Sequence, residues 1–365
     1  MTHLYKNFIA ILLGIFIIFF QGCESKSSNQ DKVIKIGAVL PISGSMAKYG
    51  KSSQQALELA LSEINHKNKI VELIIEDSAL EPKKALSAIK KLIDIDHIQG
   101  VVGPIASSET QAVVSTVMKN KIILMSPGSS APSLSDAGEY IFRTVPSDTL
   151  EGSYMADYLY NTLHKKSIAI YYIQNGFGEG IKNVFVEKYK ELGGKITTVE
   201  KFELNQQKHE TALLKVKSTN PEGIYIIGYS EMVSIFNQAY QQNLQLSLYA
   251  TTMLNDQSMV DKIDKKAVEG IVFASWDFST DSKDVSTKVF IDKFKKAYGY
   301  EPDVFAANSY DSLKILAKSI ENSTPLEYIL NIRDYAGASG VITFDNNGDV
   351  VKPMVIKRIK NGSIK

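Results

Sequence analysis

The stretch that decides the fold runs from Ile122 to Leu134 and reads Ile-Ile-Leu-Met-Ser-Pro-Gly-Ser-Ser-Ala-Pro-Ser-Leu. Its first four residues are apolar and precede a proline and a glycine, which predicts a short buried strand that ends in a loop. Gly128, Ser129 and Ser130 then lie at the carboxyl end of that strand. Ligands bind at this end of the strands in open α/β sheets, so the stretch also predicts a binding loop.

The same alternation of a short β-rich run and a longer amphipathic segment continues on both sides of this stretch. Valine- and isoleucine-rich strands that alternate with helices predict parallel sheets covered on both faces. Two consecutive series of this kind predict an α/β protein with two Rossmann-like lobes. The predicted strands are 33–40, 70–76, 99–102, 122–125, 167–172, 195–202, 223–228 and 247–250, and the predicted helices are 52–65, 82–95, 107–119, 150–163, 180–192, 209–217 and 231–242.

The C-terminal part departs from this alternation. Residues 289–298 and 306–321 predict helices, and residues 341–344 and 351–359 predict strands on either side of an Asn-Gly turn. Asn-Gly between apolar runs is a strong turn signal. The turn predicts either a hairpin or a point where the chain passes between the lobes.

The N-terminus carries an export signal. Met1 to Asn7 hold one lysine and no acid, and an apolar run of about a dozen residues follows, which is too short to span a membrane comfortably. Cys23, the only cysteine, follows Gly22 at the end of this run. Residues 1–22 are therefore predicted to be a lipoprotein signal peptide, Cys23 the acylated N-terminus and residues 23–32 a tether, whereas the alternatives are a buried free cysteine and an uncleaved anchor.

Charge and composition exclude several function classes. Loss of Lys6 with the leader leaves 40 basic and 40 acidic residues, which argues against a nucleic-acid partner. With Cys23 acylated there is no second thiol for a disulfide or a cysteine-based metal site. The four remaining histidines are scattered, and no catalytic constellation is evident. We therefore expect no catalytic residues, no cofactor and no metal.

Several motifs resemble those of the type I periplasmic binding proteins, specifically the leucine/isoleucine/valine-binding receptors of ABC transporters. The resemblance covers residues 33 to about 360, and its most specific part is the Ser-Pro-Gly-Ser-Ser-Ala-Pro block. The other matching segments are 36–44 with Tyr49-Gly50, 76–85, 101–110, 142–144 and 172–180. The resemblance implies two lobes joined by three crossover strands near 144–148, 275–281 and 345–349. It implies a first lobe of residues 33–145 with 278–346 and a second lobe of residues 146–277 with 347–365.

The first lobe supplies candidates for binding a carboxylate. Ser107 and Ser108 stand where the third helix begins, and free N–H groups and hydroxyls at a helix N-terminus suit an anion. The resemblance implies that Ser107 and Ser130, in a loop that also contains Ser129, hold the ligand carboxylate and that the Gly128 carbonyl accepts from its ammonium. The alternatives are a plain N-cap for Ser107 and a turn residue for Ser130.

Aromatic side chains are the candidates for covering the ligand. Phe177 and Tyr229 stand at two loops of the second lobe where the family places an aromatic residue, and Tyr49 is a similar candidate from the first lobe. Each is alternatively an ordinary loop aromatic. Trp276 falls at a predicted crossing, where it either lines the cleft or packs at the hinge.

One position departs from the family pattern. Leucine-type receptors place a glutamate after the fourth strand of the second lobe to meet the ligand ammonium, and here Thr252 stands nearest that position. Asp256 would substitute only if the loop ran differently. The departure leaves open whether the ligand carries an α-amino group.

The sequence as a whole predicts a lipid-anchored solute-binding protein of the periplasm or cell surface. We expect a monomer that captures a branched-chain or other aliphatic amino acid between its lobes and delivers it to an ABC transporter permease. The alternatives are another small carboxylate or amide as ligand, a sensor lipoprotein of the same fold that transports nothing, and an enzyme.

Overall fold

The computed structural model describes residues 33–365. The predicted signal peptide, the tether and Cys23 lie outside the described residues. Among residues 33–365, no helix combines the length and the apolar character that a membrane crossing requires.

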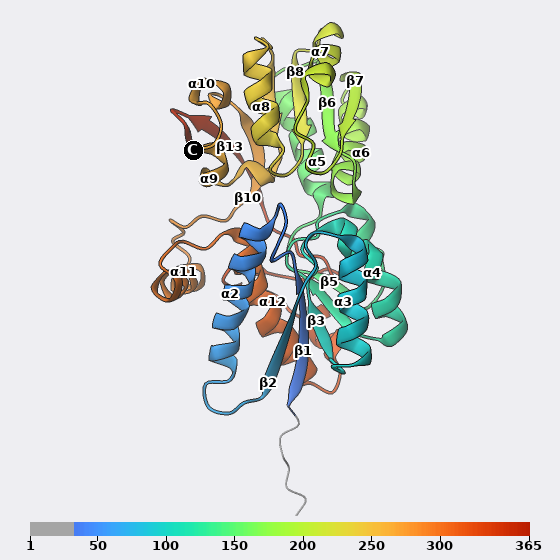
Figure 1. Ribbon diagram of the computed structural model, residues 1–365, viewed down its shortest axis with the longest axis vertical. Coiled ribbons are helices and arrows are strands. Elements are labelled where there is room, and N and C mark those ends of the chain that lie inside the picture. Colours follow the sequence, from blue (N-terminus) through green and yellow to red (C-terminus); the bar gives the residue numbers. More distant parts are fainter. Residues whose placement is uncertain (1–32) are drawn as a thin grey trace, which may run out of the picture. The chain divides into compact units, whose positions relative to one another are not determined.

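The first lobe is built on a parallel five-stranded sheet (Figure 1). The strand order is β2-β1-β3-β4-β5, the open arrangement in which ligands bind at the carboxyl ends of the strands. The strands are β1 (Ile34–Leu40), β2 (Val71–Asp77), β3 (Gly100–Val102), β4 (Ile123–Ser126) and β5 (Ile141–Arg143).

Helices cover both faces of this sheet. Because side chains alternate along a strand, Val39 packs in one apolar cluster with α3 and α4, while its neighbours Ala38 and Leu40 pack in the other. That second cluster includes α2 and α12, which pack against each other (Figure 1). The helices of this lobe are α2 (Ala47–Ile64), α3 (Pro82–Asp94), α4 (Ser107–Asn120), α11 (Val285–Tyr298), α12 (Val304–Ile320) and α13 (Pro325–Leu330), and a small hairpin joins β11 (Tyr335–Gly337) to β12 (Gly340–Ile342).

The second lobe is built on a seven-stranded sheet with the order β14-β13-β10-β9-β8-β6-β7. Its strands are β6 (Ser167–Ile173), β7 (Lys195–Phe202), β8 (Gly223–Ile227), β9 (Ser247–Ala250), β10 (Val272–Trp276), β13 (Met354–Lys360) and β14 (Ser363–Ile364). Its helices are α5 (Asp148–Asp157), α6 (Gly176–Glu191), α7 (Glu210–Ser218), α8 (Met232–Gln241), α9 (Gln257–Val260) and α10 (Lys265–Val268). A single π turn, Tyr158–Thr162, extends α5.

This second sheet differs from the expectation of a purely parallel sheet. Strands β6 to β10 are parallel, but β13 runs antiparallel to β10 and β14 antiparallel to β13. The reason is that β13 enters from the first lobe without a helical crossover, and β14 follows it after a tight turn. A parallel pair would need a longer connection.

Three segments carry the chain between the two sheets. They lie between β5 and α5, between β10 and α11, and between β12 and β13. Within the third, Phe344 and Val350 form an antiparallel bridge around the Asn-Gly turn, so the predicted hairpin and the predicted crossing both occur there. The exact residue bounds of the two lobes stay a prediction.

Candidate functional site

A small cavity lies where the two lobes meet, at the carboxyl ends of the strands. It measures about 10 Å³, which is room for about one water molecule. The first lobe contributes Ser107, Gly128 and Ser130, and the second contributes Phe177 and Tyr229. Five of the predicted site residues therefore line the same cavity. The remaining lining residues are Met46, Ile105, Ala106, Met253, Trp276 and Phe305.

Ser107 is the first residue of α4 and is 2% exposed. Its Oγ accepts a hydrogen bond of 3.1 Å from the backbone N–H of Ala131, which ties the helix start to the loop after β4. That bond uses the oxygen as acceptor and leaves the O–H proton available for another acceptor. Ser107 is therefore not a plain N-cap, since Ala106 holds the cap position. Ser108 is half-buried and does not line the cavity.

The loop after β4 packs closely against its neighbours. A Cβ on Gly128 would stand 2.8 Å from the carbonyl oxygen of Ile105 and 3.0 Å from the Phe305 ring, so only glycine fits there. The Ser129 hydroxyl is fully buried and bonds to Thr110 Oγ1 at 2.7 Å and to the carbonyl oxygen of Ile105 at 3.1 Å. Its bonds are thus internal to the first lobe, and it does not line the cavity.

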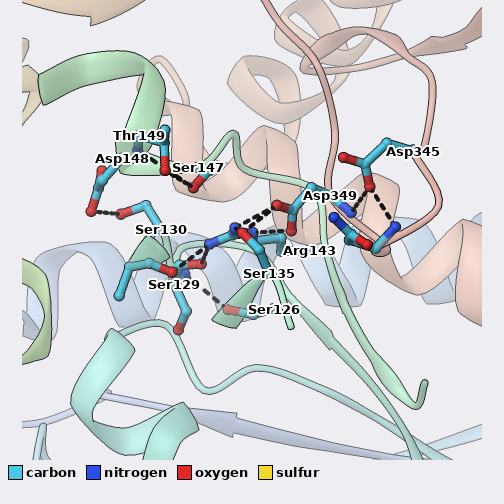
Figure 2. Close-up of polar contacts among 12 residues, drawn as sticks. Ser126, Ser129, Ser130, Ser135, Arg143, Ser147, Asp148, Thr149, Asp345 and Asp349 are labelled. Atoms are coloured by element: carbon cyan, nitrogen blue, oxygen red, sulfur yellow. Dashed lines mark hydrogen bonds and ion pairs between the residues drawn. The ribbon is translucent and has the colours of Figure 1, made fainter. Parts of the chain in front are cut away.

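Ser130 links the loop to the second lobe. Its Oγ donates a hydrogen bond of 2.9 Å to Oδ2 of Asp148, the first residue of α5 (Figure 2). The backbone N–H of Asp148 returns a bond of 2.7 Å to the Ser130 carbonyl. In this conformation the hydroxyl proton of Ser130 is engaged, so a ligand carboxylate must displace that bond or use a backbone N–H.

A buried ion pair holds the base of this loop. Arg143 bonds to both carboxylate oxygens of Asp349 and donates to the carbonyl of Ala131 at 2.9 Å, and its Nη2 donates to Ser135 Oγ at 2.7 Å (Figure 2). Asp349 lies within the third crossing segment, so the pair fixes this segment to the loop after β4. Removing one partner of such a buried pair is strongly destabilising, because the other charge is left uncompensated.

The aromatic side chains fill the cleft between the lobes. Phe177 and Tyr229 stack with ring centroids 5.0 Å apart and planes 20° from parallel. Phe305 packs edge-on against Trp276 at 6.2 Å and lies 5.2 Å from Tyr49. Phe177 belongs to the first turn of α6, which begins at Gly176, four residues before the predicted start.

Tyr49 and Thr252 line a larger neighbouring cavity of about 570 Å³, which shares Met253, Trp276 and Phe305 with the small one. The Tyr49 hydroxyl donates a hydrogen bond of 2.8 Å to Oδ2 of Asp256. Thr252 is buried, and its backbone N–H donates a hydrogen bond of 2.8 Å to Oε1 of Glu151. Asp256 thus bonds to the first lobe and not to the wall of the small cavity.

Sequence reasoning missed two buried carboxylates beside the site. Asp148 and Glu151 occupy the first turn of α5 and are 1% and 0% exposed. Burial raises the pKa of Asp148 to about 7, against the opposing effects of the Ser130 hydrogen bond and the Arg143 charge. Burial, followed by the nearby charge of Asp148, raises the pKa of Glu151 well above its ordinary value. The signal in the sequence that could have identified them is the pair of acidic residues three positions apart, directly after the first crossing.

The part of the chain from residue 33 onward contains no group of three histidine, cysteine, aspartate or glutamate side chains arranged to hold a metal ion. The site offers hydroxyls, a glycine-rich loop, buried carboxylates and aromatic rings. These groups suit recognition of a small molecule with one polar end and one apolar end.

Two lobes, three crossing segments and a cleft at the strand ends define a two-lobed solute-binding protein. The sequence model of the periplasmic binding proteins matches residues 33–363, and the chain belongs to this family, in its leucine/isoleucine/valine-binding branch. The proteins of this family bind substrates, and membership implies an extracytoplasmic location.

Known relatives span nearly the whole chain. A leucine-binding protein from Thermotoga maritima is 28% identical, with a TM-score of 0.83 over 91% of this chain and 97% of its own. The Streptococcus pneumoniae branched-chain amino acid binding protein, solved with isoleucine, is 27% identical with a TM-score of 0.82 over 92% and 98%. A Pseudomonas aeruginosa protein named for binding leucine, isoleucine, valine, threonine and alanine is 26% identical, covering 90% of each chain.

Proposed function

We propose that this protein captures an aliphatic α-amino acid, branched-chain amino acids first among them, between its two lobes and delivers it to an ABC importer. The observation that carries the proposal is the cavity at the strand ends, with polar groups from the first lobe facing stacked aromatic rings from the second. The names of the relatives from Thermotoga, Streptococcus and Pseudomonas support the same ligand class.

The proposed mechanism is closure of the lobes about the three crossing segments. The ligand carboxylate meets the Ser107 hydroxyl and the start of α4, where the helix dipole favours negative charge. Its side chain lies among Phe177, Tyr229 and Trp276. A cavity of about 150 Å³ is needed for a molecule as small as benzene, so the lobes separate and the aromatic rings move apart for the ligand to enter.

A ligand screen tests this function. Residues 33–365, freed of any co-purified ligand, are examined by thermal shift against the twenty amino acids and a set of small carboxylates and amides. A ligand that binds the folded state at 100 times its Kd stabilises that state by about 2.7 kcal/mol. We expect leucine, isoleucine or valine to raise the melting temperature most. If no amino acid in the screen raises the melting temperature, the proposal is contradicted.

We also propose that Cys23 is acylated and anchors the protein to the membrane. Cys23 is the single cysteine of the chain and follows a small residue at the end of the apolar leader. The Cys23→Ala variant should leave the membrane fraction or fail to mature. A Cys23→Ala protein that still carries a lipid would contradict this anchor.

Thr252 favours a second ligand class. By the resemblance to leucine-type receptors, Thr252 stands nearest the position of a glutamate that meets the ligand ammonium, and a buried ammonium without a partner is costly. A carboxylate without an α-amino group, or an amide, would avoid this cost. Tighter binding of 4-methylpentanoate than of leucine would support this second class.

A further inference from the structure

Two carboxyl groups on the first turn of α5 are buried, and each has a hydrogen-bond partner for only one of its two oxygens. Asp148 Oδ1 and Glu151 Oε2 have no hydrogen-bond partner among residues 33–365, and neither does the buried hydroxyl of Tyr225. Residues three apart on a helix lie on the same side. Buried polar groups in proteins are otherwise almost always paired, so unpaired oxygens of this kind point to a missing partner.

These carboxyl groups bond to both walls of the cleft. The first-lobe residue Ser130, which lines the small cavity, donates to Asp148 Oδ2 at 2.9 Å. The second-lobe residue Thr252, whose neighbour Met253 lines the same cavity, donates its backbone N–H to Glu151 Oε1 at 2.8 Å. One oxygen of each carboxyl group is thereby fixed, and the other oxygen is left without a donor.

The other buried or half-buried acids near the cleft are placed differently. Glu109 accepts from the backbone N–H of Ala106 at the start of its own helix. Glu231 accepts from the backbone N–H of Asn205, which is not on the cavity wall. Asp256 already accepts from Lys48 and Tyr49. Asp148 therefore combines an unpaired oxygen with a direct bond to a side chain of the cavity wall.

We propose that Asp148 receives the ammonium group of the ligand through Oδ1, the role that the resemblance to leucine-type receptors would give to a glutamate near the position of Thr252. This inference rests on the proposed function and names the group that selects an α-amino acid. Ser130 orients the carboxylate by holding Oδ2, while the hydroxyl of Ser107 remains for the ligand carboxylate. The cavity of about 10 Å³ is not lined by Asp148, so the proposal requires that the cleft widen around the ligand and expose Oδ1.

The test compares leucine with 4-methylpentanoate, which lacks only the amino group, on the wild-type protein and on Asp148→Asn. The asparagine keeps an acceptor for Ser130 and removes the charge. A lost bond between charged groups corresponds to about 10- to 150-fold in affinity. We expect calorimetry to show that leucine binds Asp148→Asn about 10- to 150-fold more weakly, while the affinity for 4-methylpentanoate is unchanged or higher.

Glu231→Gln is the matched control, because Glu231 is another buried carboxylate with one backbone N–H partner and one unpaired oxygen. It should keep the wild-type preference for leucine. If Asp148→Asn also keeps that preference, Asp148 is not the acceptor. If Glu151→Gln abolishes the preference and Asp148→Asn does not, the acceptor is Glu151, and the proposal is overturned. A wild-type protein that binds no α-amino acid contradicts the proposed function itself, and this inference with it.

Discussion

The Tyr49 hydroxyl donates a hydrogen bond of 2.8 Å to Oδ2 of Asp256, which joins α2 of the first lobe to the start of α9 in the second. Lys48 donates to the same oxygen at 2.5 Å. Burial alone would raise the pKa of Asp256, but the hydrogen bonds from Lys48 and Tyr49 outweigh it and lower that pKa. The contact closes the cleft beside the 570 Å³ cavity, so it stabilises the closed arrangement of the lobes.

Removing this contact should favour the open state. In Tyr49→Phe the cap of α9 by Asp256 and the Lys48–Asp256 contact remain, and only the hydrogen bond from the Tyr49 hydroxyl is lost. A net loss of about 0.5–1.5 kcal/mol corresponds to roughly 2- to 10-fold weaker ligand binding, mainly through faster dissociation. Stopped-flow kinetics measures the rate, with Asp261→Ala directly after α9 as control. An unchanged dissociation rate would show that the contact does not hold the lobes together.

Ser107 and Ser130 should both determine the affinity for the ligand. Ser107→Ala removes the free hydroxyl at the start of α4, and Ser130→Ala removes the hydroxyl that orients Asp148. Each should weaken binding by about 10- to 150-fold with little change in the unliganded melting temperature. Ser319→Ala is the control, because the buried Ser319 hydroxyl bonds only to the Leu316 carbonyl of its own helix. Calorimetry showing full affinity in both variants would locate the ligand elsewhere.

The carboxyl pair should make the unliganded protein less stable as the pH rises. The raised pKa of Asp148, about 7 against about 4 in the unfolded chain, means that its stabilising contribution is present below pH 4 and is lost as the pH rises through about 7. Glu151 acts in the same direction, because burial and the charge of Asp148 raise its pKa.

Glu151→Gln isolates this effect. The amide keeps an acceptor for the Thr252 N–H and carries no charge at any pH. The variant should melt at a higher temperature than the wild-type protein at pH 8 and at about the same temperature at pH 5. Melting curves between pH 4.5 and 8.5 check this. Equal differences at both pH values would mean that ionisation of Glu151 does not matter for stability.

Trp276 is the only tryptophan and lines the small cavity as well as the two larger ones beside it. Ligand-driven closure should exclude water from the indole and shift its emission to shorter wavelength. Trp276→Phe should remove the signal. Emission that stays constant through a saturating titration would mean that the indole environment does not change on binding.

The elements whose patterns are local could be predicted from the sequence. The helix Ser107–Asn120 lies within one residue of its predicted bounds, and Lys195–Phe202 matches its prediction. The strand Val272–Trp276 was not predicted as a strand, because its residues were assigned in part to a crossing. The helix that starts at Gly176 was predicted to start at residue 180, because three of its first five residues are glycines and glycine has a low helix propensity.

The carboxyl pair could not be predicted, for a different reason. Ser130 and Asp148 are 18 residues apart, and Glu151 and Thr252 are 101 apart. The first contact depends on how the two lobes meet and the second on how distant segments of the second lobe pack together, and no local pattern specifies either. The predicted helix began at residue 150, so Asp148 lay outside it, although it is the first residue of α5.

A crystal structure of residues 33–365 with L-leucine tests the central claim most directly, because it locates the ligand without assuming any role for a residue. The account predicts one leucine per chain between the lobes, with its carboxylate at Ser107 and its side chain against Phe177, Tyr229 and Trp276. Leucine in the 570 Å³ cavity beside Tyr49 and Asp256, or outside the cleft, would contradict it.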